Sequence, residues 1–110
     1  MISHIVCFRF LPGVTWDDPR AVAAERISRG HPRHIPDIVS WTAGRNTTSR
    51  DAAHDFAVVG LFEDRDALER YQVHPDHRRG VRAWGELSTW VVVDLDDTEG
   101  ASLGEPSPLR

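Results

Sequence analysis

A tyrosine and two histidines lie close together in the run 71–77, Tyr-Gln-Val-His-Pro-Asp-His. A phenol beside an imidazole can serve as hydrogen-bond donor and general base, because neutral histidine accepts protons near pH 7. Pro75 cannot donate a helical hydrogen bond, and it moves the residue before it out of the helical region. We therefore expect a helix carrying Tyr71 to break there, with His74 at the corner and His77 on a second helical piece. The same run also fits a structural role, in which both histidines only bond to the backbone of the corner.

Four strand-like segments and two helical segments must position these side chains. The strands are expected at residues 2–10, 38–45, 54–62 and 88–95, where apolar residues recur between turn-forming residues. The second helix is expected from an N-cap at Asp64 to about Glu86, interrupted by the corner. The order β-α-β-β-α-β predicts an α+β, ferredoxin-like fold: a four-stranded antiparallel sheet with both helices on one face.

The first helix is expected to begin at an N-cap Thr15 and to run to about Arg29, where Gly30 and Pro32 end it. Its inward stripe is expected to come from apolar residues on one face, namely Val14, Val22, Ala23 and Ile27.

The first, third and fourth strands are apolar on both faces, since their odd and even positions both carry large hydrophobic residues. One face can be covered by the helices. The other would leave more exposed apolar area than the few hundred Å² that a monomer tolerates. We therefore predict a homodimer in which two sheets pack through this face around a two-fold axis.

The chain has 110 residues, enough for one domain, which we place at residues 1–96 with a disordered or loosely packed tail at 97–110. A net charge of −4 argues against nucleic-acid binding. Cys7 is the single cysteine, so no intrachain disulfide can form. There is neither a signal peptide nor a run of ~18 apolar residues that could span a membrane, and we expect a cytoplasmic protein.

Several segments resemble the stress-responsive dimeric A/B barrel (Dabb) family, and together they cover about residues 2–95. The most specific is the block Tyr71 to His77. The others are the opening residues 4–10 followed by 12–14, and the segments 35–38, 44–46, 62–63, 66–68 and 91–95. The resemblance implies a dimeric α/β barrel, in which two sheets enclose a barrel across the dimer.

This family includes proteins known only as stress-induced, and it also includes polyketide cyclases. The resemblance implies that Tyr71 and His77 act together in a cofactor-free aldol condensation, and that His4 lines the pocket. A further pocket histidine of a characterised plant cyclase falls at Phe56, which makes the pocket more apolar here.

Two functions stay open at this stage. The first is a cofactor-independent cyclase or lyase acting on a small carbonyl compound, with Tyr71 and His77 catalytic. Its substrate would contact residues around the gap between sheet and helices: His4, Phe8, Phe56, Phe62, His74 and Trp84. The second is a non-catalytic stress-response protein or one that binds a small hydrophobic ligand. We expect no metal, because no three or four potential zinc ligands show a recognisable spacing.

Overall fold

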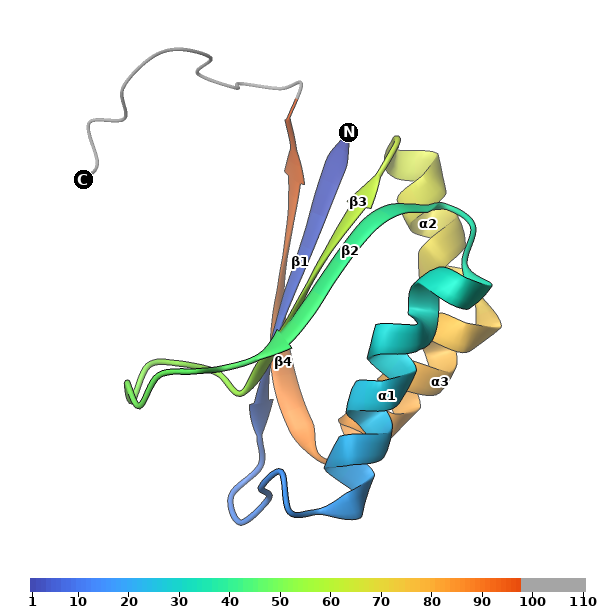
Figure 1. Ribbon diagram of the computed structural model, residues 1–110. Coiled ribbons are helices and arrows are strands. Elements are labelled where there is room, and N and C mark those ends of the chain that lie inside the picture. The colour runs from blue at the N-terminus through green and yellow to red at the C-terminus, as the bar shows by residue number, and fades with distance from the viewer. Residues whose placement is uncertain (98–110) are drawn as a thin grey trace, which may run out of the picture.

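The computed structural model describes residues 1–97, which form four strands and three helices (Figure 1). Apart from residue 97, the tail expected at 97–110 lies outside the described residues. The elements are, in order, β1 (Ile2–Phe10), α1 (Pro19–His34), β2 (Ile38–Arg45), β3 (Phe56–Phe62), α2 (Arg65–Val73), α3 (Pro75–Gly85) and β4 (Ser88–Asp96). This order confirms the predicted ferredoxin-like arrangement, with the second helix divided in two. The third strand begins two residues later than predicted, at Phe56.

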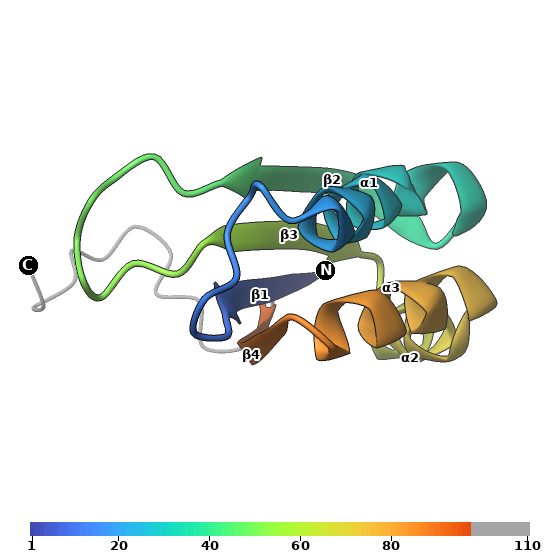
Figure 2. The same ribbon diagram turned by 90° about the horizontal axis from the view of Figure 1, so that it is seen from below.

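The sheet has the strand order β2-β3-β1-β4, and every neighbouring pair is antiparallel. All three helices cover the same face, with the sheet forming one layer and the helices the other (Figures 1 and 2). In the central strand β1, His4 is paired with Gly60 on one side and with Asp94 on the other. The sheet therefore brings residues from three distant parts of the sequence into one row.

Alternate residues of β1 point to opposite faces of the sheet. Ile2, His4, Val6 and Phe8 are buried beneath the helices. The intervening positions belong to the other face, where Ile5 is paired with Val59 and Val93. Within a single chain no element of residues 1–97 covers this second face. Its exposed large hydrophobic residues are Val59, Val91, Val93 and Leu95.

Helix α1 begins and ends later than the sequence predicts. Its N-cap is Asp18, whose carboxylate accepts a hydrogen bond from the backbone N–H of Arg20 at 2.9 Å, and not Thr15. The reason is Pro19, which is favoured at the first helical position and so fixes the start of the helix. At the other end, Pro32 lies inside the last turn, and the helix continues to His34.

The buried face of α1 also differs from the predicted one. It consists of Ala21, Ala24, Glu25, Ser28 and His31, while Ala23 is exposed and Val22 and Ile27 are only partly buried. Three of the five buried side chains are polar, and two of those, Glu25 and His31, are ionisable, so an inward stripe chosen for hydrophobicity falls on the wrong face. Hydrogen bonds to residues on other elements offset the cost of burying these polar groups.

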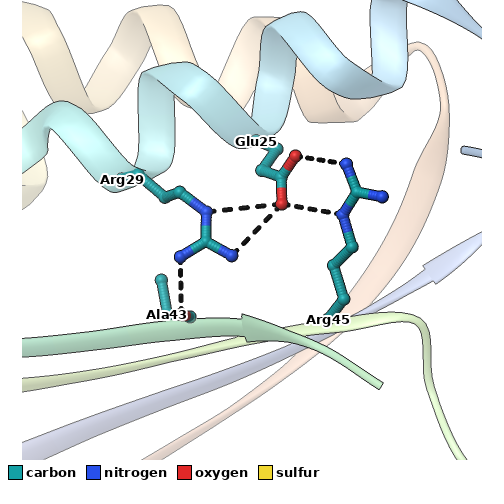
Figure 3. Close-up of polar contacts among 4 residues, drawn as sticks. All are labelled: Glu25, Arg29, Ala43 and Arg45. Atoms are coloured by element: carbon teal, nitrogen blue, oxygen red, sulfur yellow. Dashed lines mark hydrogen bonds and ion pairs between the residues drawn. The ribbon is translucent and has the colours of Figure 1, made fainter. Parts of the chain in front are cut away.

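Glu25 shows how a charged side chain can lie on that buried face (Figure 3). Its carboxylate accepts hydrogen bonds from Arg45 at 2.6 and 2.9 Å and from Arg29 at 3.2 and 3.3 Å. Arg29 also donates to the backbone carbonyl of Ala43 on β2 at 2.9 Å. These contacts join α1 to β2, and they hold in place the helix face that carries Ser28 and His31.

The break between α2 and α3 lies where Pro75 predicts it. Asp64 caps α2, as expected, by accepting from the backbone N–H of Ala67 at 2.8 Å. His74 is both the C-cap of α2 and the N-cap of α3. Its Nδ1 accepts a hydrogen bond from the backbone N–H of Asp76 at 3.0 Å. The corner lets Tyr71 and His77, on different helices, face the same space.

Candidate functional site

A cavity of about 150 Å³ lies between the sheet and the helices. Every element contributes to its lining. The polar lining residues are His4, Ser28, His31, Trp41, Tyr71, Gln72 and His77. The others are small or apolar: Val6, Phe8, Val58, Gly80, Val81, Trp84, Trp90 and Val92. Gln72, Val81, Trp90 and Val92 are the exposed members of this set, so the mouth lies where α2 and α3 face the edge strand β4.

His77 is held in one orientation by its own corner. Its Nδ1 lies 3.0 Å from the carbonyl oxygen of Gln72. A carbonyl only accepts, so Nδ1 carries the proton and Nε2 of the neutral ring has a free lone pair. Burial lowers the pKa of His77, with a smaller opposing effect from the hydrogen bond to Gln72. The His77 ring is therefore neutral at pH 7, and its Nε2 can accept a proton.

Tyr71 lies against His77, with the ring centres 4.2 Å apart. Its side chain is buried, and burial raises its pKa, helped by the negative charge of Asp94. The phenol consequently stays protonated at neutral pH and can donate a hydrogen bond. The ring of His4 lies 5.4 Å from that of Tyr71, so three groups capable of hydrogen bonding surround this part of the cavity.

The ring of His4 is held by a hydrogen bond to Asp94 on the neighbouring strand β4. Its Nδ1 lies 2.6 Å from Oδ1 of Asp94, while its Nε2 is buried and has no hydrogen-bond partner among residues 1–97. The indole Nε1 of Trp41 is also buried without a partner in this part of the chain. Gly60 lies between them in the sheet, and a Cβ there would come within 2.8 Å of the Trp41 ring. The glycine therefore gives Trp41 room to lie against the sheet.

The structure brings five of the predicted site residues together at the cavity: His4, Phe8, Tyr71, His77 and Trp84. Three others lie elsewhere. Phe56 and Phe62 are fully buried in the core and are not among the lining residues. His74 is occupied as the helix cap described above. The catalytic and binding roles themselves stay predictions.

Among the lining residues that were not predicted as site residues, Ser28, His31 and Trp41 have side chains that can form hydrogen bonds inside the cavity. Ser28 accepts a hydrogen bond from Trp84 Nε1 at 2.8 Å. His31 is 3% exposed, and its Nδ1 lies 2.7 Å from Oδ2 of Asp76. Glu25, Ser28 and His31 recur at intervals of three, which places them on one helix face, but this spacing does not indicate that the face is buried.

No three His, Cys, Asp or Glu side chains of residues 1–97 are grouped as the ligands of a metal ion would be. In the same range, no helix combines the length and apolar character needed to cross a membrane.

The two histidines predict how stability depends on pH. Burial lowers the pKa of both His31 and His77 below 6.5, so each binds a proton more readily in the unfolded chain. The free energy of unfolding should therefore fall as the pH drops below about 6.5. The carboxylates with lowered pKa values act later, below their ordinary values of 3.8 to 4.5. Urea unfolding at pH 7.5 and 5.5 measures this loss, and His77→Phe should reduce it. An unchanged loss in this variant would contradict the assignment.

Comparison with known proteins places these features in a family. The model of the stress responsive A/B barrel domain matches residues 2–97. An uncharacterised protein of Streptomyces coelicolor is 40% identical over 96 residues, which cover 87% of this chain and 99% of that protein.

Solved structures share the fold. A dimeric ferredoxin-like protein of unknown function from Thermobifida fusca is 28% identical with a TM-score of 0.75, covering 86% of this chain and 88% of its own. The hydroxynitrile lyase of Passiflora edulis is 13% identical with a TM-score of 0.72, covering 86% of this chain and 90% of its own. At that identity the second likeness shows the fold alone.

Proposed function

Because the chain belongs to the stress responsive A/B barrel domain family, we propose that it is a homodimeric, cofactor-independent enzyme acting on a small carbonyl compound as a cyclase or lyase. The observation that carries the proposal is the pairing of His77 and Tyr71 at one cavity. One ring is a neutral base with a free Nε2, and the other is a phenol that stays protonated. These are the two groups that enolate chemistry needs.

In the proposed reaction, His77 Nε2 takes a proton from the carbon next to a carbonyl group. The electron pair of the broken C–H bond moves into the carbonyl, and Tyr71 donates a hydrogen bond to the resulting enolate oxygen. The enolate carbon then attacks a second carbonyl and forms the new C–C bond. The alkoxide takes back the proton from the imidazolium of His77, which restores the base. The reverse sequence is a lyase reaction.

The homodimer is proposed from the uncovered face of the sheet. Four large hydrophobic residues are exposed there, flanked by the partly buried Ile5 and Leu61. Packing two such faces around a two-fold axis would remove both from water at once. The Thermobifida fusca protein of the same fold is described as dimeric, which supports this arrangement.

A second function is favoured by the size of the cavity. Its volume of about 150 Å³ is below the ~300–1,000 Å³ of sites for drug-sized ligands. A non-catalytic protein that binds a small hydrophobic ligand would need no more space than this.

Exchange of α-protons for deuterium separates the two functions. NMR spectroscopy in D₂O follows this exchange in small apolar ketones, with cyclohexanone as the first probe. If His77 is the base, the protein should accelerate the exchange, and His77→Ala should reduce the acceleration by about 100-fold or more. The matched control is His34→Ala, because His34 is exposed on α1 and does not line the cavity. Equal exchange in the two variants would exclude His77 as the base. Binding of the ketone without exchange would favour the second function.

A further inference from the structure

The cavity has two unlike ends. At its mouth the lining residues are exposed and mostly apolar, including Val81, Trp90 and Val92. Away from the mouth, α1 contributes the buried side chains of Ser28 and His31. The leading end of a ligand that enters through this mouth would therefore meet Ser28 and His31.

His31 is fixed in this inner position by Asp76 on α3. Oδ2 of Asp76 lies 2.7 Å from Nδ1 of His31, and Oδ1 accepts a hydrogen bond from Arg79 at 3.0 Å. The hydrogen bonds to His31 and Arg79 outweigh burial and lower the pKa of Asp76, so it is a carboxylate that only accepts. Nδ1 of His31 therefore carries a proton. Burial lowers the pKa of His31, so the ring is neutral at pH 7 and its Nε2 is an acceptor.

Gly80 makes room for this Nε2 beside α3. A Cβ at position 80 would lie 2.9 Å from Nε2 of His31, closer than real side chains allow. Glycine inside a helix costs about 1 kcal/mol relative to alanine, and α3 carries it at the point where His31 approaches. Both residues line the cavity, and the other ring nitrogen of His31 is already bonded to Asp76.

We propose that His31 is a ligand-binding residue, whose Nε2 accepts a hydrogen bond from a hydroxyl group on a small, flat, apolar ligand. The rings of Trp41 and Tyr71 also line the cavity, with their centres 5.7 and 6.3 Å from that of His31, and aromatic side chains of this kind suit contact with another ring. A volume of about 150 Å³ matches one ring, since an engineered apolar cavity of similar size in another protein binds benzene. The ligand class is thus a single ring carrying a hydroxyl or enol group. This inference uses the cavity of the proposed enzyme, but it does not require catalysis by His77.

Phenol and toluene test the inference, because they have nearly the same shape and only phenol can donate a hydrogen bond. NMR titration should show that the protein binds phenol at least about tenfold more tightly than toluene, the ratio expected for one buried hydrogen bond. His31→Leu should remove this preference, and His34→Leu, an exposed position one turn away, should keep it. A preference unchanged in His31→Leu, or binding of neither probe, would overturn the inference.

Two further measurements keep the test informative if His31→Leu does not fold. In the unchanged protein, the ¹⁵N resonance of His31 Nε2 should move when phenol is added and stay in place with toluene. Gly80→Ala should weaken phenol binding, because its methyl group would press on Nε2. A resonance that does not move with bound phenol would overturn the assignment of His31. Loss of α-proton exchange in His77→Ala with phenol binding intact would separate this site from the catalytic one.

Discussion

Replacing Val93 with arginine is expected to convert a homodimer of this protein into monomers. Val93 lies on β4 at the centre of the uncovered face, where it is paired with Ile5 of β1. Its side chain is 50% exposed in a single chain. In the proposed dimer it would be buried against the partner.

The expected loss of dimer affinity is large because a two-fold axis would bring both copies of the substituted residue into the same interface. The substitution would place two guanidinium groups in one interface whose residues around position 93, Ile5, Val91 and Leu95, are apolar. The dissociation constant should rise at least about a hundredfold, which corresponds to roughly 3 kcal/mol. Light scattering coupled to size-exclusion chromatography measures the outcome, as a fall from twice the chain mass of 12.4 kDa toward that mass.

Val73→Arg is the matched control. Val73 is 57% exposed, similar to Val93, but it lies on α2 on the helical side of the molecule. This variant should keep the mass of the unsubstituted protein. If the unsubstituted protein is itself a monomer at micromolar concentration, or if Val93→Arg leaves a dimer intact, the sheet face is not the interface.

The strands could be predicted from sequence because their pattern is local. Alternation in β1 and β3 shows which residues share a face, and the start of β3 two residues later than predicted does not change this. The corner at Pro75 was equally accessible, since proline limits the backbone whatever surrounds it. The positions of Tyr71 and His77 follow from these two features together.

Helix α1 could not be predicted as well, because its buried face depends on partners far away in sequence. Glu25 is buried because Arg45, on β2, bonds to it, and His31 is buried because Asp76, on α3, bonds to it. Neither pairing has a signal within α1 itself. A search for apolar residues selects Ala23 and Ile27 instead and so misses the side of the cavity that α1 provides.

The roles of Gly60 and Gly80 can be assigned only from the folded structure. Gly60 makes room for Trp41, and Gly80 makes room for His31. In the sequence, a glycine within a strand indicates a bulge or a close approach without naming the partner. Trp41 and His31, whose rings approach these glycines, both line the cavity. Each glycine therefore allows a cavity side chain to pack closely against the backbone of another element.

Trp84→Ala is expected to destabilise the fold more than any other single truncation in the core. Trp84 is 1% exposed, its ring stacks at 4.4 Å on Phe8 and at 5.2 Å on Phe56, and its Nε1 donates to Ser28. Truncation would leave a void between α3 and the sheet and remove the donor to Ser28. Such changes typically cost about 3–5 kcal/mol, a large part of the ~5–15 kcal/mol that stabilises a small domain.

Two further variants serve as comparisons for the loss of stability expected in Trp84→Ala. Trp84→Phe keeps a ring in the stack but removes the hydrogen bond to Ser28, so it should cost about 1–3 kcal/mol. Trp90→Ala removes the same side chain from the cavity mouth, where 36% of the residue is exposed, and should cost less than Trp84→Ala. Urea unfolding at one fixed protein concentration measures all three, since the stability of a dimer depends on concentration. If Trp90→Ala proved the more damaging of the two alanine variants, the stack around Trp84 would not be the main support of the helical layer. The cavity beside it would then need another explanation for its shape.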